Sequence, residues 1–457
     1  MGKYKKILTG RGALLFAFAL AVMADPVSSV AYAIEAALRS LNGDLSLLLP
    51  TMGLVVGIIT LIIINYHQLV ARYPEGGGAA AAAGEAFGEA WAFVPIGALV
   101  VDFVLTIAIS VSAGASALIA YFPTLASYRI IIALFLLLAV AGLTWFGHIG
   151  RAVFATMTVA FVIVSLMVLT GGIQAQPVAV VSTVQSAHPA FIAILLAFPV
   201  AMALATGVEA PSSAIAQLGQ LDNKGRKFFG RVTLWLTLAT VGLLTIGFTF
   251  VAVKLGIGIP QADSTQIADI ARVSVGSHVF AAFQFVTALL LLAAASSSFQ
   301  AGPGLLKALA RKTHKSGIIY GVLHPHLGRT NHHHTPYFAV AVFLIISALV
   351  VLAAGAKDQE LVLFYAVSVF VSFFIGLMAM ARFAISDRKP GNALLNGFGA
   401  LVVGFTLVVN LSRGDPIISL VASLLIAAVL YALWVRAGRP KGISQAVIEG
   451  ENVAPQS

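Results

Sequence analysis

The chain has 457 residues, of which 60% are hydrophobic and only 10% are charged. Soluble proteins carry about 25% charged residues, so this composition excludes a soluble domain and indicates an integral membrane protein. The formal net charge is +10, but the basic residues flank apolar segments as topology signals, which argues against nucleic-acid binding. The chain has no cysteine, which excludes disulfide bonds and thiol chemistry.

Twelve apolar segments approach the length of about 20 residues that a helix needs to cross a bilayer core. In chain order, spans one to twelve cover 12–38, 45–66, 90–121, 130–146, 152–169, 190–216, 232–253, 279–299, 337–354, 361–380, 394–410 and 417–435. We therefore predict an all-α membrane protein whose residues 1–457 form one transmembrane domain. Its core would be 12–383, followed by accessory helices over 392–437 and a short cytoplasmic tail over 438–457.

The basic residues predict the orientation of these spans. With the N-terminus placed in the cytoplasm, 21 of the 27 Lys and Arg residues fall inside. The six outside are Arg39, Arg129, Lys254, Arg272, Lys357 and Arg413. This bias predicts an even number of spans with both termini in the cytoplasm. The first segment contains Asp25 and Glu35 and is too long for a signal peptide, so we interpret it as a retained helix.

Spans one and six each carry an interruption. In span one Asp25 is followed by Pro26, and in span six Gly207 lies between Pro199 and Pro211. A carboxylate at bilayer depth costs at least ~2.5 kcal/mol, and proline removes a backbone donor. Paired interrupted helices, one in each half of a chain, are typical of a five-plus-five inverted repeat with a binding site near the midplane.

Span one offers ligands for a cation. Asp25 and Tyr32 are seven residues apart and share a helix face, and Ser28 and Ser29 add hydroxyls. A dehydrated monovalent cation prefers hard oxygen donors with little excess charge, which one carboxylate, hydroxyls and free carbonyls provide. The alternative is that Asp25 only caps the half-helix after the break.

Two further spans carry polar stripes. In span three, Asp102, Thr106 and Ser110 are spaced by four residues and share one face. The alternative for Asp102 is a packing helix whose acid is satisfied by a neighbour's backbone. Tyr365 of span ten lies on a face with two serines, and a buried structural tyrosine is an equally good interpretation.

In span six, Thr206 and Glu209 flank Gly207, which permits unwinding and the close approach of a ligand. Apolar surroundings disfavour the charged form of Glu209. It is therefore a candidate proton carrier, with a neutral, hydrogen-bonded structural role as the alternative.

Three other features have weaker functional interpretations. Glu35 is predicted at the outer rim of the site. The glycine-rich segment 72–78 is predicted to be a hinge or a tight inner-surface segment, because no Lys-Ser/Thr follows to bind phosphate. The histidine-rich loop 314–334 is interpreted as a solvated basic loop, because no acidic or thiol ligand accompanies its histidines.

Five motifs in chain order resemble the KUP potassium-uptake family, in particular its KimA-type bacterial members, within the amino acid–polyamine–cation (APC) superfamily. They cover 25–32, 73–79, 102–114, 206–210 and 364–370. The resemblance implies a LeuT-type fold and a proton-coupled potassium importer. Relatives of this type usually carry a large cytoplasmic C-terminal domain, which we expect this chain to lack. Pro26 also departs from the small residue expected after the aspartate.

By the same resemblance, potassium would be held by six side chains and the proton by Glu209. The six are Asp25, Tyr32, Asp102, Thr106, Thr206 and Tyr365, with Ser28, Ser29 and Ser110 as supporting polar groups. The implied partners are the potassium ion and the lipid bilayer, with no cofactor and no enzymatic activity.

Three alternatives remain for function. An amino-acid or amine permease of the same fold is the first, although Asp25 would repel a substrate carboxylate where such permeases present glycine-rich backbone. A divalent-metal transporter is disfavoured because no soft ligand appears. A membrane sensor would need a signalling domain. We predict a secondary active transporter that couples potassium uptake to protons by alternating access.

Overall fold

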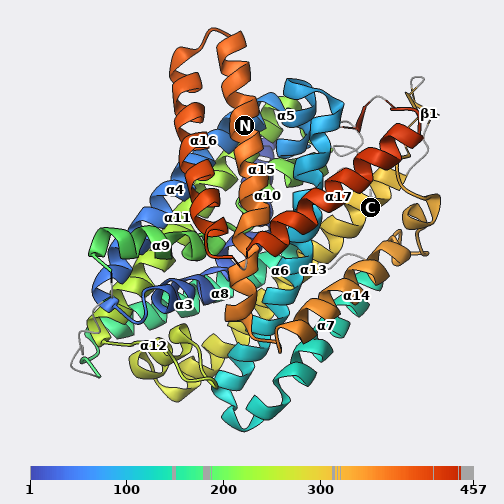
Figure 1. Ribbon diagram of the computed structural model, residues 1–457. Coiled ribbons are helices and arrows are strands. Elements are labelled where there is room, and N and C mark those ends of the chain that lie inside the picture. The colour runs from blue at the N-terminus through green and yellow to red at the C-terminus, as the bar shows by residue number, and fades with distance from the viewer. Residues whose placement is uncertain are drawn as a thin grey trace.

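The computed structural model describes residues 2–146, 151–178, 186, 188–310, 314–315, 318–319, 321–414, 416–440 and 442–443. Within these residues the protein is almost entirely helical (Figure 1). The α-helices are α1 (Gly2–Val22), α2 (Ala24–Ser28), α3 (Val30–Ser40), α4 (Leu45–Arg72), α5 (Gly78–Phe87), α6 (Phe93–Tyr121), α7 (Arg129–Trp145), α8 (Arg151–Gln174), α9 (Ala190–Ala201), α10 (Ala210–Ala214), α11 (Asn223–Leu255), α12 (Gln266–Ser274), α13 (Ser277–Ala310), α14 (Tyr337–Ala353), α15 (Asp358–Ser386), α16 (Pro390–Leu411) and α17 (Ile417–Arg436).

Short 3₁₀-helices and one small hairpin complete the described elements. The 3₁₀-helices are η1 (Glu89–Ala92), η2 (Pro123–Tyr128), η3 (Met202–Ala205), η4 (Ile215–Gln217) and η5 (Pro325–Gly328). Strands β1 (His314–Lys315) and β2 (Ile318–Ile319) pair antiparallel, with His314 opposite Ile319. The sequence did not predict this hairpin, because two-residue strands carry no periodicity.

Ten helical segments of the described chain are long and apolar enough to cross a membrane. They correspond to ten of the twelve expected spans. The other two, spans one and nine, appear as shorter apolar helices over Gly12–Val22 and Tyr337–Ala353. The prediction of an all-helical membrane protein is confirmed, while the count of twelve crossings and the inverted repeat stay predictions.

Helix α6 lies at the centre of the bundle. It contacts α13, α15, α17 and α7. In its most apolar stretch 78% is buried inside the protein, the largest share among the candidate spans. A helix covered by other helices can carry a polar side chain without exposing it to lipid. This position explains how span three accommodates Asp102.

Span one is interrupted twice, but only for one residue each time. Met23 separates α1 from α2, and Ser29 separates α2 from α3. Both residues keep right-handed helical backbone angles. The carbonyls of Asp25 and Pro26 accept the hydroxyls of Ser28 and Ser29 at 2.7 and 2.6 Å. The break expected around 24–29 is therefore present, but these two carbonyls are occupied rather than free, which corrects that part of the prediction.

Span six is unwound more strongly. After α9 and η3, Thr206 has an extended backbone with ψ 133°, and Gly207 takes the left-handed φ of +71°. The helix restarts only at α10, whose first turn contains Pro211. Glycine supplies the positive φ at little steric cost, and proline is tolerated in a first turn because it needs no hydrogen-bond partner there. This confirms the predicted interruption.

Two short helices escaped the sequence analysis. The glycines at 76, 77 and 78 all have positive φ, which forms a tight turn, but α5 follows at once and its alanines are buried. Helix α12 lies in the connection between α11 and α13. At ten and nine residues these helices are too short to stand out in a hydropathy profile.

The helices predicted to be accessory are joined to the core by polar contacts. Asn65 of α4 donates to Asn396 of α16 at 2.8 Å, and Asn396 donates to Gln68 at 2.9 Å. Helix α17 packs closely on α6, where Gly97 lies against the backbone of Ser423. Only a residue without a side chain permits this approach.

Loops predicted to lie inside and outside fall at opposite ends of the bundle, while the end that faces the cytoplasm stays a prediction. Figure 1 shows the α15–α16 turn and β1 at one end, and α12 and the α6–α7 connection at the other. The first end carries Arg388 and Lys389, predicted inside, and the second carries Arg129 and Arg272, predicted outside.

Candidate ion-binding site

The interruptions of spans one and six meet at Asp25 and Gly207. A Cβ atom on Gly207 would lie 2.8 Å from Asp25 Oδ2 and 2.9 Å from Pro26 Cδ. The Ser29 hydroxyl adds a second link by donating to Leu204 O at 3.2 Å. The carboxylate of Asp25 therefore lies against the unwound backbone of the other interrupted helix.

Three carboxyl side chains gather around this contact. Asp25 interacts electrostatically with Asp102 of α6, and both interact with Glu209 beyond the break in span six. Asp102 is 3% exposed, and Asp25 and Glu209 are half-buried. One oxygen of each acid is buried without a hydrogen-bond partner among the described residues, namely Asp25 Oδ1, Asp102 Oδ1 and Glu209 Oε2. Asp25 and Asp102 therefore face a common region, and neither is fully satisfied by local backbone.

Hydroxyl groups surround the acids. Thr106 donates to Tyr365 Oη at 3.1 Å, and the Tyr365 side chain also lies next to the Asp102 carboxylate. On the other side, the side chain of Tyr32 lies next to that of Thr206. All four hydroxyl-bearing residues are at most 2% exposed. The structure thus brings together the six predicted cation ligands from α2, α3, α6, α15 and the span-six break.

The three predicted supporting serines have different surroundings. Ser28 and Ser29 donate their hydroxyls to backbone carbonyls of span one, so they brace the interruption. Their oxygens keep lone pairs with which to accept a hydrogen bond or face a cation. Ser110 is buried on α6, one turn beyond Thr106.

The structure adds Tyr66 of α4, which the sequence analysis did not select. Tyr66 is 2% exposed, interacts electrostatically with Glu209 and lies next to Ser372 of α15. The only signal in the sequence is a pair of polar-tipped residues, Asn65 and Tyr66, at the end of the apolar run of span two. A single tyrosine carries too little information to reveal which neighbour it faces.

Glu35 does not line an open rim, which corrects that prediction. The residue is 3% exposed, its Oε1 accepts Arg39 Nε at 2.8 Å, and its Oε2 accepts the backbone N–H of Gln266 at 3.0 Å. Gln266 is the first residue of α12. A carboxylate at a helix N-terminus satisfies unpaired backbone donors and complements the helix dipole. Glu35 therefore joins α3 to α12.

The donor set of the site consists of carboxylate, hydroxyl and carbonyl oxygens. No group of three or more His, Cys, Asp or Glu side chains arranged to hold a metal ion occurs in the part of the chain that the structure describes. Much of the first part of the histidine-rich loop, including residues 316–317 and 320, lies outside that part. Hard oxygen donors suit alkali and alkaline-earth cations more than soft transition metals.

An all-helical membrane protein with buried acids at two interrupted helices has the features of a secondary transporter. Comparison with known families agrees: the family model described as "Amino acid permease" matches residues 14–446. The chain therefore belongs to the amino acid permease family. It is a secondary transporter of the APC superfamily and not an enzyme.

Three individual relatives are 32% identical to the chain or less. The chain is 32% identical over 407 residues to "Potassium transporter KimA" of Bacillus subtilis (strain 168). This match includes 84% of the chain and spans 64% of that relative's length. The chain also aligns with crystal structures of two mutants of a manganese transporter from Eremococcus coleocola. Each alignment covers 96% of this chain and 95% of the transporter chain, with 14% identity and a TM-score of 0.49. That overlap is too loose to establish a common fold or substrate.

Proposed function

We propose that this protein imports potassium across the bacterial cytoplasmic membrane in symport with protons. The observation that carries the proposal is the meeting of Asp25, Asp102 and Glu209, each with a buried oxygen that no described residue satisfies. The relative named as a potassium transporter supports the choice of ion, at 32% identity.

The charges favour a cation as the transported species. No Lys, Arg or His of the described chain is among the groups that interact electrostatically with these three acids. Burying uncompensated negative charge is very unfavourable. Bound cations, protons or both must therefore neutralise the three carboxyl groups, which is what coupling of an ion to a proton requires.

The ligand types favour a large monovalent ion. Tyr32, Thr106, Thr206 and Tyr365 supply neutral hydroxyl oxygens beside Asp25 and Asp102. Neutral oxygens replace a hydration shell without adding charge, whereas the soft ligands preferred by transition metals are missing from this set. Asp25 and Asp102 would hold the ion, and Glu209 would carry the proton.

Transport would proceed by alternating access. In this proposal the two halves of the core form a five-plus-five inverted repeat, and one bundle rocks against the other around the interrupted helices. Because Asp25 lies against Gly207, an ion bound at span one would act directly on span six. Protonation of Glu209 would bias which side of the membrane is open.

The test is growth of potassium-auxotrophic bacteria at limiting potassium, combined with rubidium uptake into proteoliposomes. Asp25→Asn and Asp102→Asn should each abolish rescue and uptake, because each removes a negative charge from the ion site. Glu360→Gln, which removes an exposed carboxylate at the start of α15, is the matched control. Normal uptake by both aspartate variants would refute the proposed ion site.

Amino-acid or amine transport is the second candidate, because the matching family model is that of amino acid permeases. Asp25 at the span-one break would repel a substrate carboxylate, while an amine would be attracted. Uptake of radiolabelled amino acids and amines into the same proteoliposomes separates the two proposals. Robust saturable uptake of these compounds, with no potassium-driven proton movement, would reverse the ranking.

A further inference from the structure

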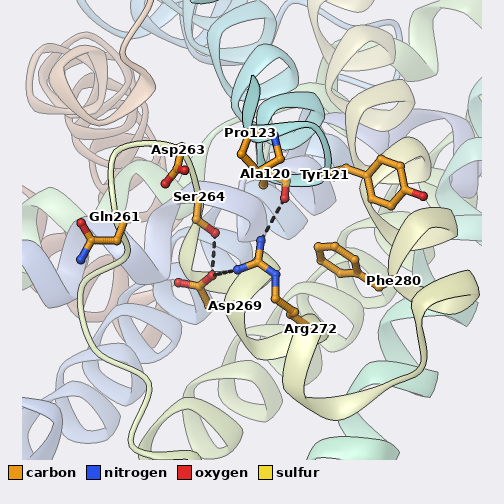
Figure 2. Close-up of a pocket in the computed structure, with 9 residues that line it drawn as sticks. All are labelled: Ala120, Tyr121, Pro123, Gln261, Asp263, Ser264, Asp269, Arg272 and Phe280. Carbon is orange, nitrogen blue, oxygen red and sulfur yellow. Dashed lines mark hydrogen bonds and ion pairs between the residues drawn. The ribbon is translucent and has the colours of Figure 1, made fainter. Parts of the chain in front are cut away.

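A second polar cavity lies at the end of the bundle predicted to face outside, away from the proposed ion site. Its volume is about 450 Å³, which falls in the range of about 300–1,000 Å³ typical of small-molecule sites. Its walls come from the end of α6, the loop before α12, α12 itself and α13 (Figure 2). Gln261 and Arg272, which line it, are both exposed, so the cavity is accessible to solvent.

Among the described residues that line this cavity, the only basic side chain is already engaged. Arg272 Nη1 pairs with Asp269 at 2.9 Å, its Nη2 donates to Ala120 O at 2.9 Å, and its guanidinium carbon lies 5.2 Å from the centroid of the Phe280 ring. Ser264 donates to the same Asp269 carboxylate at 2.6 Å. Arg272 and Asp269 therefore neutralise each other and fasten α12 to the end of α6.

The remaining charge is the carboxylate of Asp263, on the loop that leads into α12. Asp263 has no hydrogen bond or ion pair within the described residues, and it is half-buried in the cavity wall. The Phe280 ring lies on another wall (Figure 2), backed by Tyr121 at 5.8 Å between ring centroids. The cavity thus combines one carboxylate that no described side chain pairs with and an aromatic ring that the Arg272 guanidinium approaches at 5.2 Å from its centroid.

We propose that this cavity binds a small organic cation of the alkylammonium class. A carboxylate together with an aromatic face is the combination that attracts ammonium groups, through charge and through the ring quadrupole. A bare inorganic cation would leave most of a cavity this large unfilled. A carboxylate-bearing zwitterion would need a free basic group, and Arg272 is already paired.

Occupation of the cavity would also affect transport, an inference that depends on the proposed function. The bound cation would touch α6, α12 and α13 at once. The N-terminus of α12 is held by Glu35 of α3. Tyr32 of the ion site also lies on α3. A ligand that clamps α12 to α6 would hinder opening of the outer side, so we expect external organic cations to slow ion uptake.

Binding is measured first, by isothermal titration of the full-length protein in detergent with benzyltrimethylammonium and choline. We expect saturable binding that weakens about tenfold in Asp263→Asn and severalfold in Phe280→Leu. Glu360→Gln, which removes an exposed carboxylate from the same end of the molecule outside the cavity, should bind like the wild type. Thermal unfolding verifies that each variant is folded. Asp263→Asn should keep the stability of the wild type, because Asp263 has no hydrogen bond or ion pair within the described residues.

Three results would overturn the proposal: the absence of saturable binding, unchanged binding to Asp263→Asn, or equally tight binding of the zwitterion glycine betaine. The second arm measures rubidium uptake into proteoliposomes with and without external benzyltrimethylammonium. Titration does not depend on transport, so a failure of the potassium proposal would leave the cation-binding result interpretable. Binding without inhibition would refute only the clamping of α12.

Discussion

The carboxylate of Asp25 and the backbone of Gly207 are in direct contact, although 182 positions separate them in the sequence: a Cβ on Gly207 would lie 2.8 Å from Asp25 Oδ2. Each residue belongs to one of the two interrupted spans. The φ of +71° at Gly207 turns the chain so that its backbone, rather than a side chain, faces the acid. The ion site proposed above depends on this contact.

Gly207→Ala should abolish ion uptake. The new methyl group would meet Asp25 and Pro26 at under 3 Å, and an alanine at positive φ costs about 1–2 kcal/mol. We expect a loss of stability of about 1–3 kcal/mol and no detectable rubidium uptake by the protein that remains folded. Thermal unfolding in detergent and proteoliposome uptake measure the two effects.

The matched control for this substitution is Gly53→Ala on α4, where an added Cβ meets nothing within 4 Å. It should leave uptake unchanged, because alanine is favoured over glycine inside a helix. Wild-type uptake by Gly207→Ala would mean that the two interruptions do not need to touch.

Thr106→Val and Tyr365→Phe should each weaken ion binding without destroying the fold. The two hydroxyls are joined at 3.1 Å, and a hydrogen bond contributes about 0.5–1.5 kcal/mol, equivalent to roughly 3- to 10-fold in affinity. Because both variants break the same bond, their effects should be less than additive in the double variant. The measurement is the dependence of uptake on rubidium concentration. Additive effects of the two substitutions would argue against a shared site.

Glu209→Gln should uncouple ion movement from protons. Glutamine keeps the shape and the hydrogen-bonding ability of the side chain but cannot exchange a proton. We expect rubidium uptake in this variant to respond little to an imposed pH gradient, while the wild type is accelerated when the outside is acidic. Proteoliposomes with a pH-sensitive dye report the rubidium and proton fluxes. If the variant responds to the pH gradient like the wild type, a residue other than Glu209 couples the proton.

Glu35→Ala should lower stability while leaving ion affinity nearly unchanged. The substitution removes the pair with Arg39 and leaves the first backbone N–H of α12 without its acceptor. A buried unpaired donor costs about 1–3 kcal/mol. Glu35→Gln is the control, since its amide oxygen can still accept from Gln266. A large rise in the rubidium concentration needed for half-maximal uptake would restore the original prediction of a rim role.

Asn396→Ala should destabilise the attachment of α16. It leaves the amide of Asn65 without its partner on the neighbouring helix, and such bonds between membrane helices contribute about 0.5–2 kcal/mol. Asn392→Ala, one turn earlier and exposed, should have little effect on thermal unfolding. Equal melting temperatures for the two variants would show that α16 is held by apolar packing alone.

The ten long helical segments could be predicted because membrane-spanning apolar runs are visible in composition alone. The interruptions could also be located, since Asp25-Pro26 and Gly207 violate helix preferences locally. The role of Glu35 was predicted wrongly because one of its contacts is not local in the sequence. Its partner Gln266 lies in α12, a short helix with no hydropathy signal, so nothing near Glu35 in the sequence shows that its carboxylate is already occupied.

The sequence by itself determined that this is a helical membrane protein with acids at bilayer depth, because the cost of transferring each residue into lipid depends mainly on that residue and its immediate neighbours. Only the tertiary structure decided that Asp25, Asp102 and Glu209 meet, that Tyr66 joins them and that Asp263 and Phe280 line the same cavity. Those relationships depend on the packing of helices distant in the chain, which follows from side-chain shape across many contacts rather than from the pattern of any one segment.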